Sequence, residues 1–462
     1  MGEYTLENGA YQLENGTYLQ REPDGGGGGG GDGGTVAAGG DGTGTGSPGF
    51  ESDLTTTKRA QADLGMDGSG GTPINDDLQA AAGDNVKIVF EPGEYVIDPR
   101  NGGKGMVFYD LQNFGIVGDG GTRRDVRFKH PDGRAGRLWN FTNDCDNVWW
   151  GNFVVDHNAP GSFSELYWTA DGELYAYNIA HIGSATDENR VGGPGDPNGN
   201  YAALAFSMEV GGSAWIENYQ NIEPPERLVD YPDNSQGVFA GYGNRGAIDL
   251  VNARIEFKGE HACYASRSRA PVRIRGGRFV DNANTNMRIA GSGSFIRNAT
   301  VGITRSERSL READTGEVKA CRGLRVEANL DRLGGKTGGY AENCDFVKTS
   351  NIGNSSMLIE INGSVGSFDV RDCRIRDESA DSSATVDVEP VGEGVTPPTP
   401  HDATIARTAF TGGGDSTAVD SRRYDAPTNV VDCCLGVSGG SGFVGAIDES
   451  GTSTSGCSRA NL

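Results

Sequence analysis

Short strands recur along the second half of the chain as a four-residue unit: one polar residue, one small residue, any residue and one apolar residue. The units are Asn252–Ile255, Gly276–Phe279, Asn298–Val301, Asn343–Phe346, Asp372–Ile375, Arg407–Phe410 and Asp432–Leu435. Their apolar positions lie 24, 22, 45, 29, 35 and 25 residues apart, and 45 is close to two turns of a shorter repeat. Short strands at this period, without long helices, indicate a β-solenoid whose coils bury their apolar side only against neighbouring coils.

The start of this repeat array has its own pattern. Residues 72–83 read as a short amphipathic helix that ends at a glycine. The strand pattern Val86–Phe90 follows, and then the segments 91–97 and 114–120, in which glycine and apolar residues alternate with charged ones. We therefore expect one helix before the first strands of the solenoid.

The first 22 residues hold a different repeat, with a period of seven. Tyr and Leu stand two positions apart, which places both side chains on one face of a strand, and Asn-Gly closes each unit as a turn. Such β-arches are too small to bury a core alone. We expect this segment to act as an anchor that docks on a partner through apolar side chains. These are Tyr4, Leu6, Tyr11, Leu13 and Tyr18.

Composition divides the rest of the chain. Residues 23–50 are rich in Gly, Thr and Ser and include an unbroken glycine run, which is typical of a flexible linker. We assign 51–440 to the solenoid, with inserted loops over 157–242 that interrupt the repeat, and 441–462 to a C-terminal tail or cap.

The charge pattern limits the classes of partner. The chain has 64 acidic and 40 basic residues and a net charge of -24, which disfavours binding to phosphate backbones. Lysine is scarce among the basic residues, so the surface resembles that of proteins from near-saturated salt, where self-repulsion is screened; an ordinary acidic protein is the alternative. The sequence has no apolar run long enough for a membrane span.

The N-terminus favours neither of the common export signals. Met1-Gly2-Glu3-Tyr4 has no basic region followed by an apolar one, as a Sec signal would, and no Arg pair. We therefore expect a protein that leaves the cell by another route.

The chain contains 8 cysteines. Cys344, Cys373 and Cys433 occupy the small-residue position of their units, so period two places them inside, as a column of small buried thiols. Eight cysteines in a chain of this length are not dense enough to predict a disulfide scaffold, and we favour free thiols. Neither the cysteines nor the five histidines have the spacing of metal ligands. We predict no cofactor; calcium or magnesium has acidic residues available but no recognisable motif.

The segments 72–120 and 270–304 resemble right-handed parallel β-helix proteins of the pectin lyase-like superfamily, including tailspike-like proteins and proteins of haloarchaea and their viruses. The most specific parts are Val89-Phe90-Glu91-Pro92-Gly93-Glu94-Tyr95 and Phe114-Gly115-Ile116-Val117-Gly118-Asp119-Gly120. The resemblance covers about residues 70–440. It implies an all-β, right-handed parallel β-helix, but the fold hosts lyases, hydrolases and inert adhesins.

Enzymes of this family act on polysaccharides and need clustered acids. A glycoside hydrolase needs two carboxyl groups at a set separation, one with a raised pKa. Weak candidates are Asp156, Glu165, Asp171, Asp249 and Glu260, with Arg267 or Arg269 as a lyase-type base. Gly259-Glu260-His261-Ala262 only approximates a Gly-His-Gly hydrolase motif, and the sequence leaves enzymatic activity open while favouring a binding role.

Aromatic residues gather over 139–242, which holds all five tryptophans and many tyrosines. Aromatic rings beside Asp and Asn suit sugar rings, and Tyr and Trp also anchor protein interfaces. We predict ligand binding by Tyr167, Trp168, Tyr175 and Tyr177; the alternative is that such rings pack loops onto the solenoid, which we favour for Trp149 and Phe153.

These features together predict a spike-like virion appendage of a virus that infects a halophilic archaeon. Residues 1–22 would dock to other virion proteins, and the solenoid would bind a host-surface glycan or glycoprotein outside the cell. The resemblance implies a homotrimer, which would add avidity. An active depolymerase and a purely architectural virion spacer are the alternatives.

Overall fold

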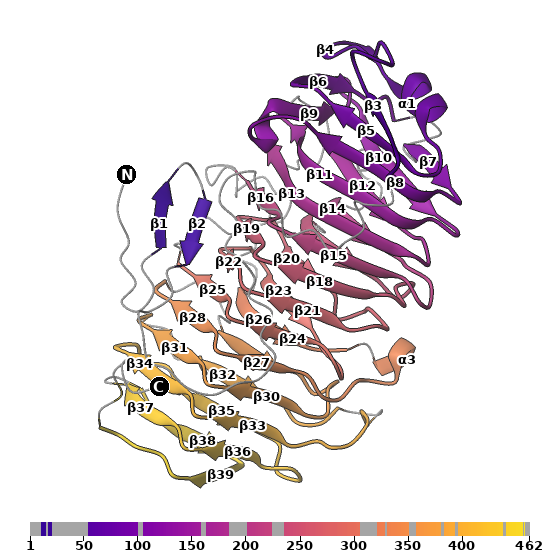
Figure 1. The fold of residues 1–462 in the computed structure, drawn as a ribbon. Coiled ribbons are helices and arrows are strands. Elements are labelled where there is room, and N and C mark those ends of the chain that lie inside the picture. The colour runs from indigo at the N-terminus through magenta and orange to yellow at the C-terminus, as the bar shows by residue number, and fades with distance from the viewer. Residues whose placement is uncertain are drawn as a thin grey trace, which may run out of the picture.

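The computed structural model describes residues 11–14, 17–20, 54–99, 105–158, 163–183, 201–223, 235–304, 321–328, 330–350, 357–379, 383–392, 396–437, 440–455 and 457. From residue 54 onward, this part of the chain winds into stacked coils of parallel strands, running from the indigo end to the yellow end in Figure 1. Each complete coil contributes one strand to each of three parallel sheets. The predicted all-β parallel β-helix is confirmed.

Sheet 1 is a 12-stranded parallel sheet. Its strands in chain order are β7 (Met106–Tyr109), β10 (Ala135–Thr142), β12 (Phe163–Trp168), β14 (Tyr201–Phe206), β17 (Ser235–Ala240), β20 (His261–Tyr264), β23 (Thr285–Ile289), β26 (Arg322–Val326), β29 (Ile359–Ile361), β32 (Val386–Val388), β35 (Val419–Ser421) and β38 (Phe443–Gly445). Neighbours in this order pair in parallel register, so equivalent residues of successive coils form rows along the solenoid.

Sheet 2 follows sheet 1 in every coil. Its strands are β3 (Thr56–Arg59), β5 (Val86–Phe90), β8 (Gln112–Gly118), the first parts of β11 (Asp146–His157) and β13 (Glu173–Gly183), β15 (Ser213–Glu217), β18 (Ala247–Val251), β21 (Val272–Arg275), β24 (Phe295–Arg297), β27 (Tyr340–Glu342), β30 (Phe368–Arg371), β33 (Ala403–Ala406), β36 (Thr428–Val431) and β39 (Ile447–Ser450).

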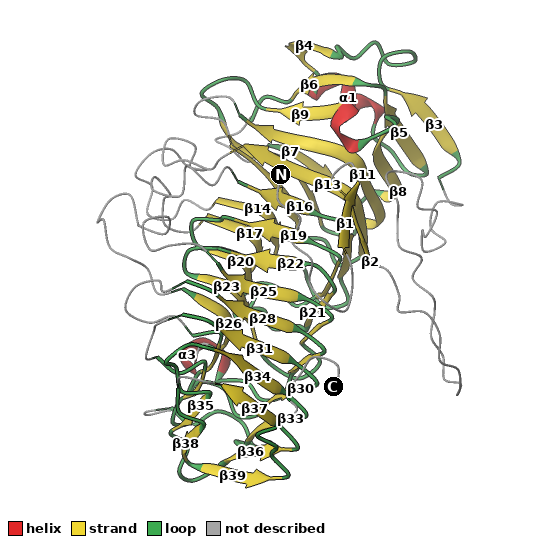
Figure 2. Ribbon diagram, turned by 90° about the vertical axis from the view of Figure 1, so that its left-hand side faces the viewer, coloured by secondary structure: helices red, strands yellow, loops and turns green. Residues whose placement is uncertain are grey.

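Sheet 3 completes the coil. Its strands are β4 (Ser69–Pro73), β6 (Gly93–Val96), β9 (Val126–Lys129), the second parts of β11 and β13, β16 (Gln220–Ile222), β19 (Arg254–Glu256), β22 (Arg278–Val280), β25 (Thr300–Ile303), β28 (Asp345–Lys348), β31 (Arg374–Asp377), β34 (Ala409–Gly412) and β37 (Cys434–Val437). Figure 2 shows the strands of successive coils stacked one above another.

The repeated four-residue unit is the turn from sheet 2 into sheet 3. Its first residue has a positive φ, for example 50° at Asn252 and 51° at Asn343, a conformation that Asn tolerates better than most residues. Neighbouring turns are tied together, since Asn343 Nδ2 donates to Asn298 Oδ1 at 2.7 Å. The last residue of most units joins the core, and the predicted repeat is confirmed.

One interval was misread. The 45-residue spacing between Val301 and Phe346 was expected to hold two turns, but β25 pairs directly with β28. The spacing is therefore a single coil enlarged by long connections, because insertions between strands leave the register of the stacked strands unchanged.

A short helix covers the N-terminal end of the core. Helix α1 spans Asn75–Ala81, less than the 72–83 expected, because Pro73 ends strand β4. Leu78 and Ala81 belong to the hydrophobic core of the solenoid. Figures 1 and 2 place α1 at the first coils, as expected for a capping helix. Among the described residues, the other helical elements are the 3-10 turn η2 (Arg123–Asp125) and α3 (Leu330–Leu333).

The expected interruption of the repeat over 157–242 is wrong for the residues that the structure describes. The described part of that segment contributes strands from β12 to β17 in register with the coils before and after them. Trp139, Trp150 and Trp168 are each 0% exposed, so the aromatic residues that suggested loops largely fill the solenoid interior instead. The loop Val191–Asn198 lies outside the described residues.

The cysteines follow the prediction with one exception. Six are free and buried, including the column Cys344, Cys373 and Cys433. Burial raises the pKa of the Cys263 thiol to about 12. Cys434 and Cys457 form a disulfide, which the expectation of free thiols missed. The pair forms because Cys434 follows the inward Cys433 and so takes the outward side of the strand, where the chain returns after β39.

Near the N-terminus, β1 (Tyr11–Glu14) and β2 (Thr17–Gln20) form an antiparallel hairpin that sets Leu13 opposite Tyr18. The predicted Asn15-Gly16 turn lies outside the described residues. Tyr4, Leu6 and the linker 23–50 lie outside the described residues. In the described part of the chain, no helix has the length and hydropathy of a membrane span.

Candidate functional site

The outer face of sheet 1 displays one continuous row of side chains. Leu166 and Trp168 belong to the core, so Tyr167 between them projects outward by the alternation of a strand. The strand register extends this row along the solenoid. Its members are Asn140, Tyr167, Ala205, Phe239, Tyr264, Arg288, Arg325, Glu360, Asp387 and Asp420. The row changes from aromatic to charged toward the C-terminus.

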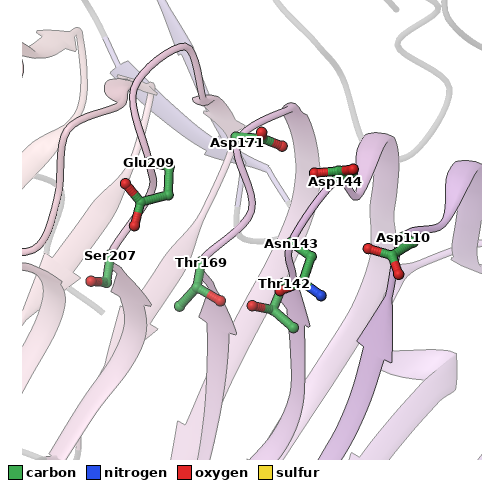
Figure 3. A pocket seen from close by; sticks show the side chains of 8 residues that line it. All are labelled: Asp110, Thr142, Asn143, Asp144, Thr169, Asp171, Ser207 and Glu209. Atoms are coloured by element: carbon green, nitrogen blue, oxygen red, sulfur yellow. The ribbon is translucent and has the colours of Figure 1, made fainter.

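A groove of about 530 Å³ opens where the first strands of sheet 1 end. Four consecutive coils line it, with residues at or just after the ends of β7, β10, β12 and β14. They are Asp110, Thr142, Asn143, Asp144, Thr169, Asp171, Ser207 and Glu209. Figure 3 shows the three hydroxyl side chains at the ends of neighbouring strands, with carboxylates on the turns beyond them. We call this surface the acidic groove.

The acidic groove is rich in hydrogen-bond acceptors. Four carboxylates and three hydroxyls line it. The successive strands that carry them lie about 4.8 Å apart. Such groups accept hydrogen bonds from sugar hydroxyls, and carboxylates also attract cations. Among the described residues, no three His, Cys, Asp or Glu side chains are grouped to hold a metal ion.

Tyr167 joins the outward row to the acidic groove. Its side chain is hydrogen-bonded to Ser207, and burial raises the pKa of Tyr167. Arg137 lies over the Tyr167 ring at 3.9 Å and donates from Nε to Glu165 Oε1 at 2.9 Å. Burial raises the pKa of Glu165 to about 7, although Arg137 opposes this rise. This carboxyl group lies on β12, two residues before Tyr167 and four before Thr169 in the groove.

Farther along sheet 1, His261 lies between groups of opposite charge. Its Nε2 atom is 3.0 Å from Arg288 Nη1 and 3.2 Å from Glu260 Oε1. Burial lowers the pKa of His261, so the ring is neutral and Nε2 either accepts from Arg288 or donates to Glu260. Arg267 covers the Tyr264 ring at 4.7 Å on the same coil.

At the charged end of the row, guanidinium groups and carboxylates are paired with one another. Arg325 Nε contacts Glu327 Oε2 at 2.9 Å and Glu360 Oε1 at 2.8 Å, and Arg322 and Arg288 contact the same two carboxylates. Three guanidinium groups and two glutamates thus form one buried network. It stabilises the sheet surface and leaves few donors available to a ligand.

The predicted catalytic residues do not converge. Asp156 lies on β11 in sheet 3 and contacts Arg127 at 3.5 Å, and Asp249 lies on β18 in sheet 2. Glu260 and Arg267 flank β20 in sheet 1. These four residues therefore lie on three different sheets, and they do not share one groove. His157 and His261 are buried in strands β11 and β20.

The predicted ligand-binding aromatics fare differently. The prediction that Trp168 binds a ligand is wrong, because its side chain points into the core. Tyr175 and Tyr177 lie on sheet 2, where Tyr175 packs on Trp149 and donates to Glu217 Oε2 at 3.1 Å. Only Tyr167 lies beside the acidic groove. The groove itself escaped prediction except for Asp171, because its hydroxyls and carboxylates come together only through the coil register.

Comparison with known proteins gives neither a family nor an activity. No protein-family model matches the chain, and no curated protein matches it in sequence. The A-module of a mannuronan C-5 epimerase of Azotobacter vinelandii is 12% identical with a TM-score of 0.49, covering 86% of this chain and 98% of that one. PfbA, a surface adhesin of Streptococcus pneumoniae, is 9% identical with a TM-score of 0.47, covering 86% and 93%.

The Dettilon tailspike protein is also similar, with 12% identity and a TM-score of 0.40, covering 84% of this chain and 68% of that one. At these identities and TM-scores, neither a catalytic role nor a ligand transfers to this chain.

Proposed function

We propose that the protein is a carbohydrate-binding surface protein that holds a glycan in the acidic groove beside Tyr167. One observation carries this proposal: hydroxyl and carboxylate side chains of four successive coils line a single open groove. A sugar chain offers hydroxyl donors at regular intervals to such acceptors. The half-buried Tyr167, tied to Ser207, supplies an aromatic edge next to them.

The double variant Asp171→Asn/Glu209→Gln is expected to raise the Kd for the bound glycan about tenfold, because two charge-assisted hydrogen bonds become neutral ones. A glycan array finds the ligand, and titration calorimetry then measures the Kd. The control Asp448→Asn/Glu449→Gln makes the same charge change on β39, far along the solenoid, and is expected to bind like wild type. Unchanged binding by the groove variant would exclude the groove as the site.

We further propose that this binding serves a virion appendage of a virus of a halophilic archaeon. The acid-rich, lysine-poor composition supports a high-salt setting. The Tyr/Leu repeat, which forms a hairpin over residues 11–20, supports an anchor to other virion proteins. A homotrimer would multiply weak glycan contacts.

Removal of residues 1–24 is expected to leave a folded body that no longer joins particles. Electron microscopy and immunoblotting of purified particles would measure incorporation, with circular dichroism as the check on folding. Normal incorporation of the shortened chain would exclude the anchor role.

Glycan cleavage is the second candidate function, favoured by Glu165. Its pKa of about 7 is that of a general acid able to donate a proton near neutral pH. Incubation with the bound glycan and assay of new reducing ends separates the two functions. If the wild-type protein releases new reducing ends and the Glu165→Gln variant does not, the protein cleaves the glycan. If the wild-type protein leaves the glycan intact, it only binds it.

A further inference from the structure

A strip of arginines and stacked rings lies on the outer face of sheet 2. Two neighbouring rows form it, as the strand register shows: Asp249, Arg273, Phe295, Tyr340 and Asp369 in one, and Arg275, Arg297, Glu342 and Arg371 in the other. We call this surface the arginine strip. It carries four guanidinium groups and three carboxylates, on a chain whose net charge is -24.

Two carboxylates in the arginine strip are each shared between two guanidinium groups. Asp249 contacts Arg273 at 3.0 Å and Arg275 at 3.2 Å. Glu342 contacts Arg297 at 2.6 Å and Arg371 at 2.9 Å. Each trio therefore has one positive charge in excess, and Asp369 beside Arg371 offsets one of the two.

The rings hold the guanidinium groups in place. Phe295 and Tyr340 stack with centroids 5.2 Å apart and planes 13° from parallel. Arg297 lies 4.9 Å from both ring centroids, and Arg371 lies 4.3 Å from that of Tyr340. The side chains of Arg273, Arg275, Arg297 and Arg371 still expose 35%, 39%, 38% and 32% of their surface. Fixed, partly exposed guanidinium groups lose little entropy when they bind an anion.

We propose that the arginine strip binds a linear anionic polysaccharide that carries carboxylate or sulfate groups. Guanidinium groups lie on β21, β24 and β30, three of four successive strands that are about 4.8 Å apart, so they can contact several anionic groups along one polymer. Each can form paired hydrogen bonds to a carboxylate or a sulfate. This site is separate from the acidic groove, which would repel such a polymer.

The charge of the chain favours a polysaccharide over a nucleic acid. The strip has an excess of only one positive charge, and the remainder of the surface repels a densely charged phosphate backbone. Phe295 is 7% exposed and covered by guanidinium groups, so it offers no open ring for base stacking.

Binding to immobilised polygalacturonate, heparin and neutral dextran tests the proposal, at a salt concentration where circular dichroism shows the chain folded. We expect wild type to bind at least one of the two anionic polymers and not dextran. The variant Arg297→Gln/Arg371→Gln is expected to bind about tenfold more weakly. Polygalacturonate and heparin distinguish carboxylate from sulfate recognition.

Three further proteins complete the experiment. Arg127→Gln/Arg376→Gln removes the same charge from ion pairs on sheet 3 and is expected to bind like wild type. Arg297→Lys/Arg371→Lys keeps the charge but not the planar fork, and is expected to fall between wild type and the glutamine variant. The groove variant Asp171→Asn/Glu209→Gln should retain polyanion binding, so failure of one site is distinct from failure of the other.

Several results would overturn the proposal. One is no binding of either anionic polymer by wild type, and another is equal loss in the sheet 3 variant. Binding of duplex DNA as tight as that of the polysaccharides would make the strip a general polyanion surface and would exclude a glycan site. If the glutamine variant fails to fold, an undiminished affinity of the lysine variant would also exclude the paired hydrogen bonds that the proposal requires.

Discussion

Replacing Lys258 by methionine is expected to lower the free energy of unfolding by about 3–5 kcal/mol, because Glu223 loses its partner in the interior. Lys258 and Glu223 are both 1% exposed and form an ion pair at the ends of β19 and β16. Methionine has nearly the same length, so the change in packing is small. Chemical denaturation followed by circular dichroism measures the loss.

A second variant separates the charge effect from packing. Glu223→Gln/Lys258→Met removes both charges and is expected to recover part of the lost stability. A single Lys258→Met variant within about 1 kcal/mol of wild type would show that the pair is not a desolvated interior contact.

Acidification from pH 5 to pH 3 is expected to remove about 2–3 kcal/mol of stability, because the cost of two buried histidines that resist protonation exceeds the opposing contribution of two buried carboxyl groups. Burial, aided by the positive charge of Lys258, lowers the pKa of His157 to about 3. Burial and the neighbouring His157 lower the pKa of His181 well below its usual value. His181 faces the interior in register with Val155, and its Nδ1 lies 3.0 Å from the Tyr219 hydroxyl.

The sign follows from which state binds the proton. Below pH 6.5 the unfolded chain protonates these histidines while the folded chain does not, so stability falls until the pH reaches the folded pKa. Glu165 and Asp387 act in the opposite direction, because burial raises their pKa to about 7 and about 6. Their effect is complete once the pH drops below the unfolded pKa of about 4. The histidine loss therefore dominates at lower pH.

Denaturation curves at pH 5, 4 and 3 measure this slope. The variant His157→Asn/His181→Asn is expected to reduce it by nearly 3 kcal/mol per pH unit, because two linked protons are removed. Equal slopes in the variant and wild type would contradict the assignment of acid sensitivity to these side chains.

The fold was predictable because stacking repeats a local constraint. Each unit from Asn252 onward needs a residue that tolerates positive φ, then a small inward residue, then an apolar one. These demands are local and therefore visible in the sequence. The same logic predicted the thiol column at Cys344 and Cys373.

The candidate site was less predictable because it depends on register between distant segments. Thr142, Thr169 and Ser207 have no motif in common and come together only when β10, β12 and β14 align. Abundant aromatic residues suggested exposed loops, whereas Trp168 serves the core. Composition cannot tell an inward ring from an outward one when the period of a strand is unknown.

The two ends of the solenoid are stabilised in different ways, and this determines the end at which unfolding begins. Helix α1 buries Leu78 and Ala81 over the first coils, whereas the last coil holds through strand pairing and the Cys434–Cys457 link. Since every coil contacts only its neighbours, loss of an end coil exposes the next one as a new free edge. A reductant would therefore loosen the molecule from its C-terminal rung and leave the groove near α1 among the last regions to come apart.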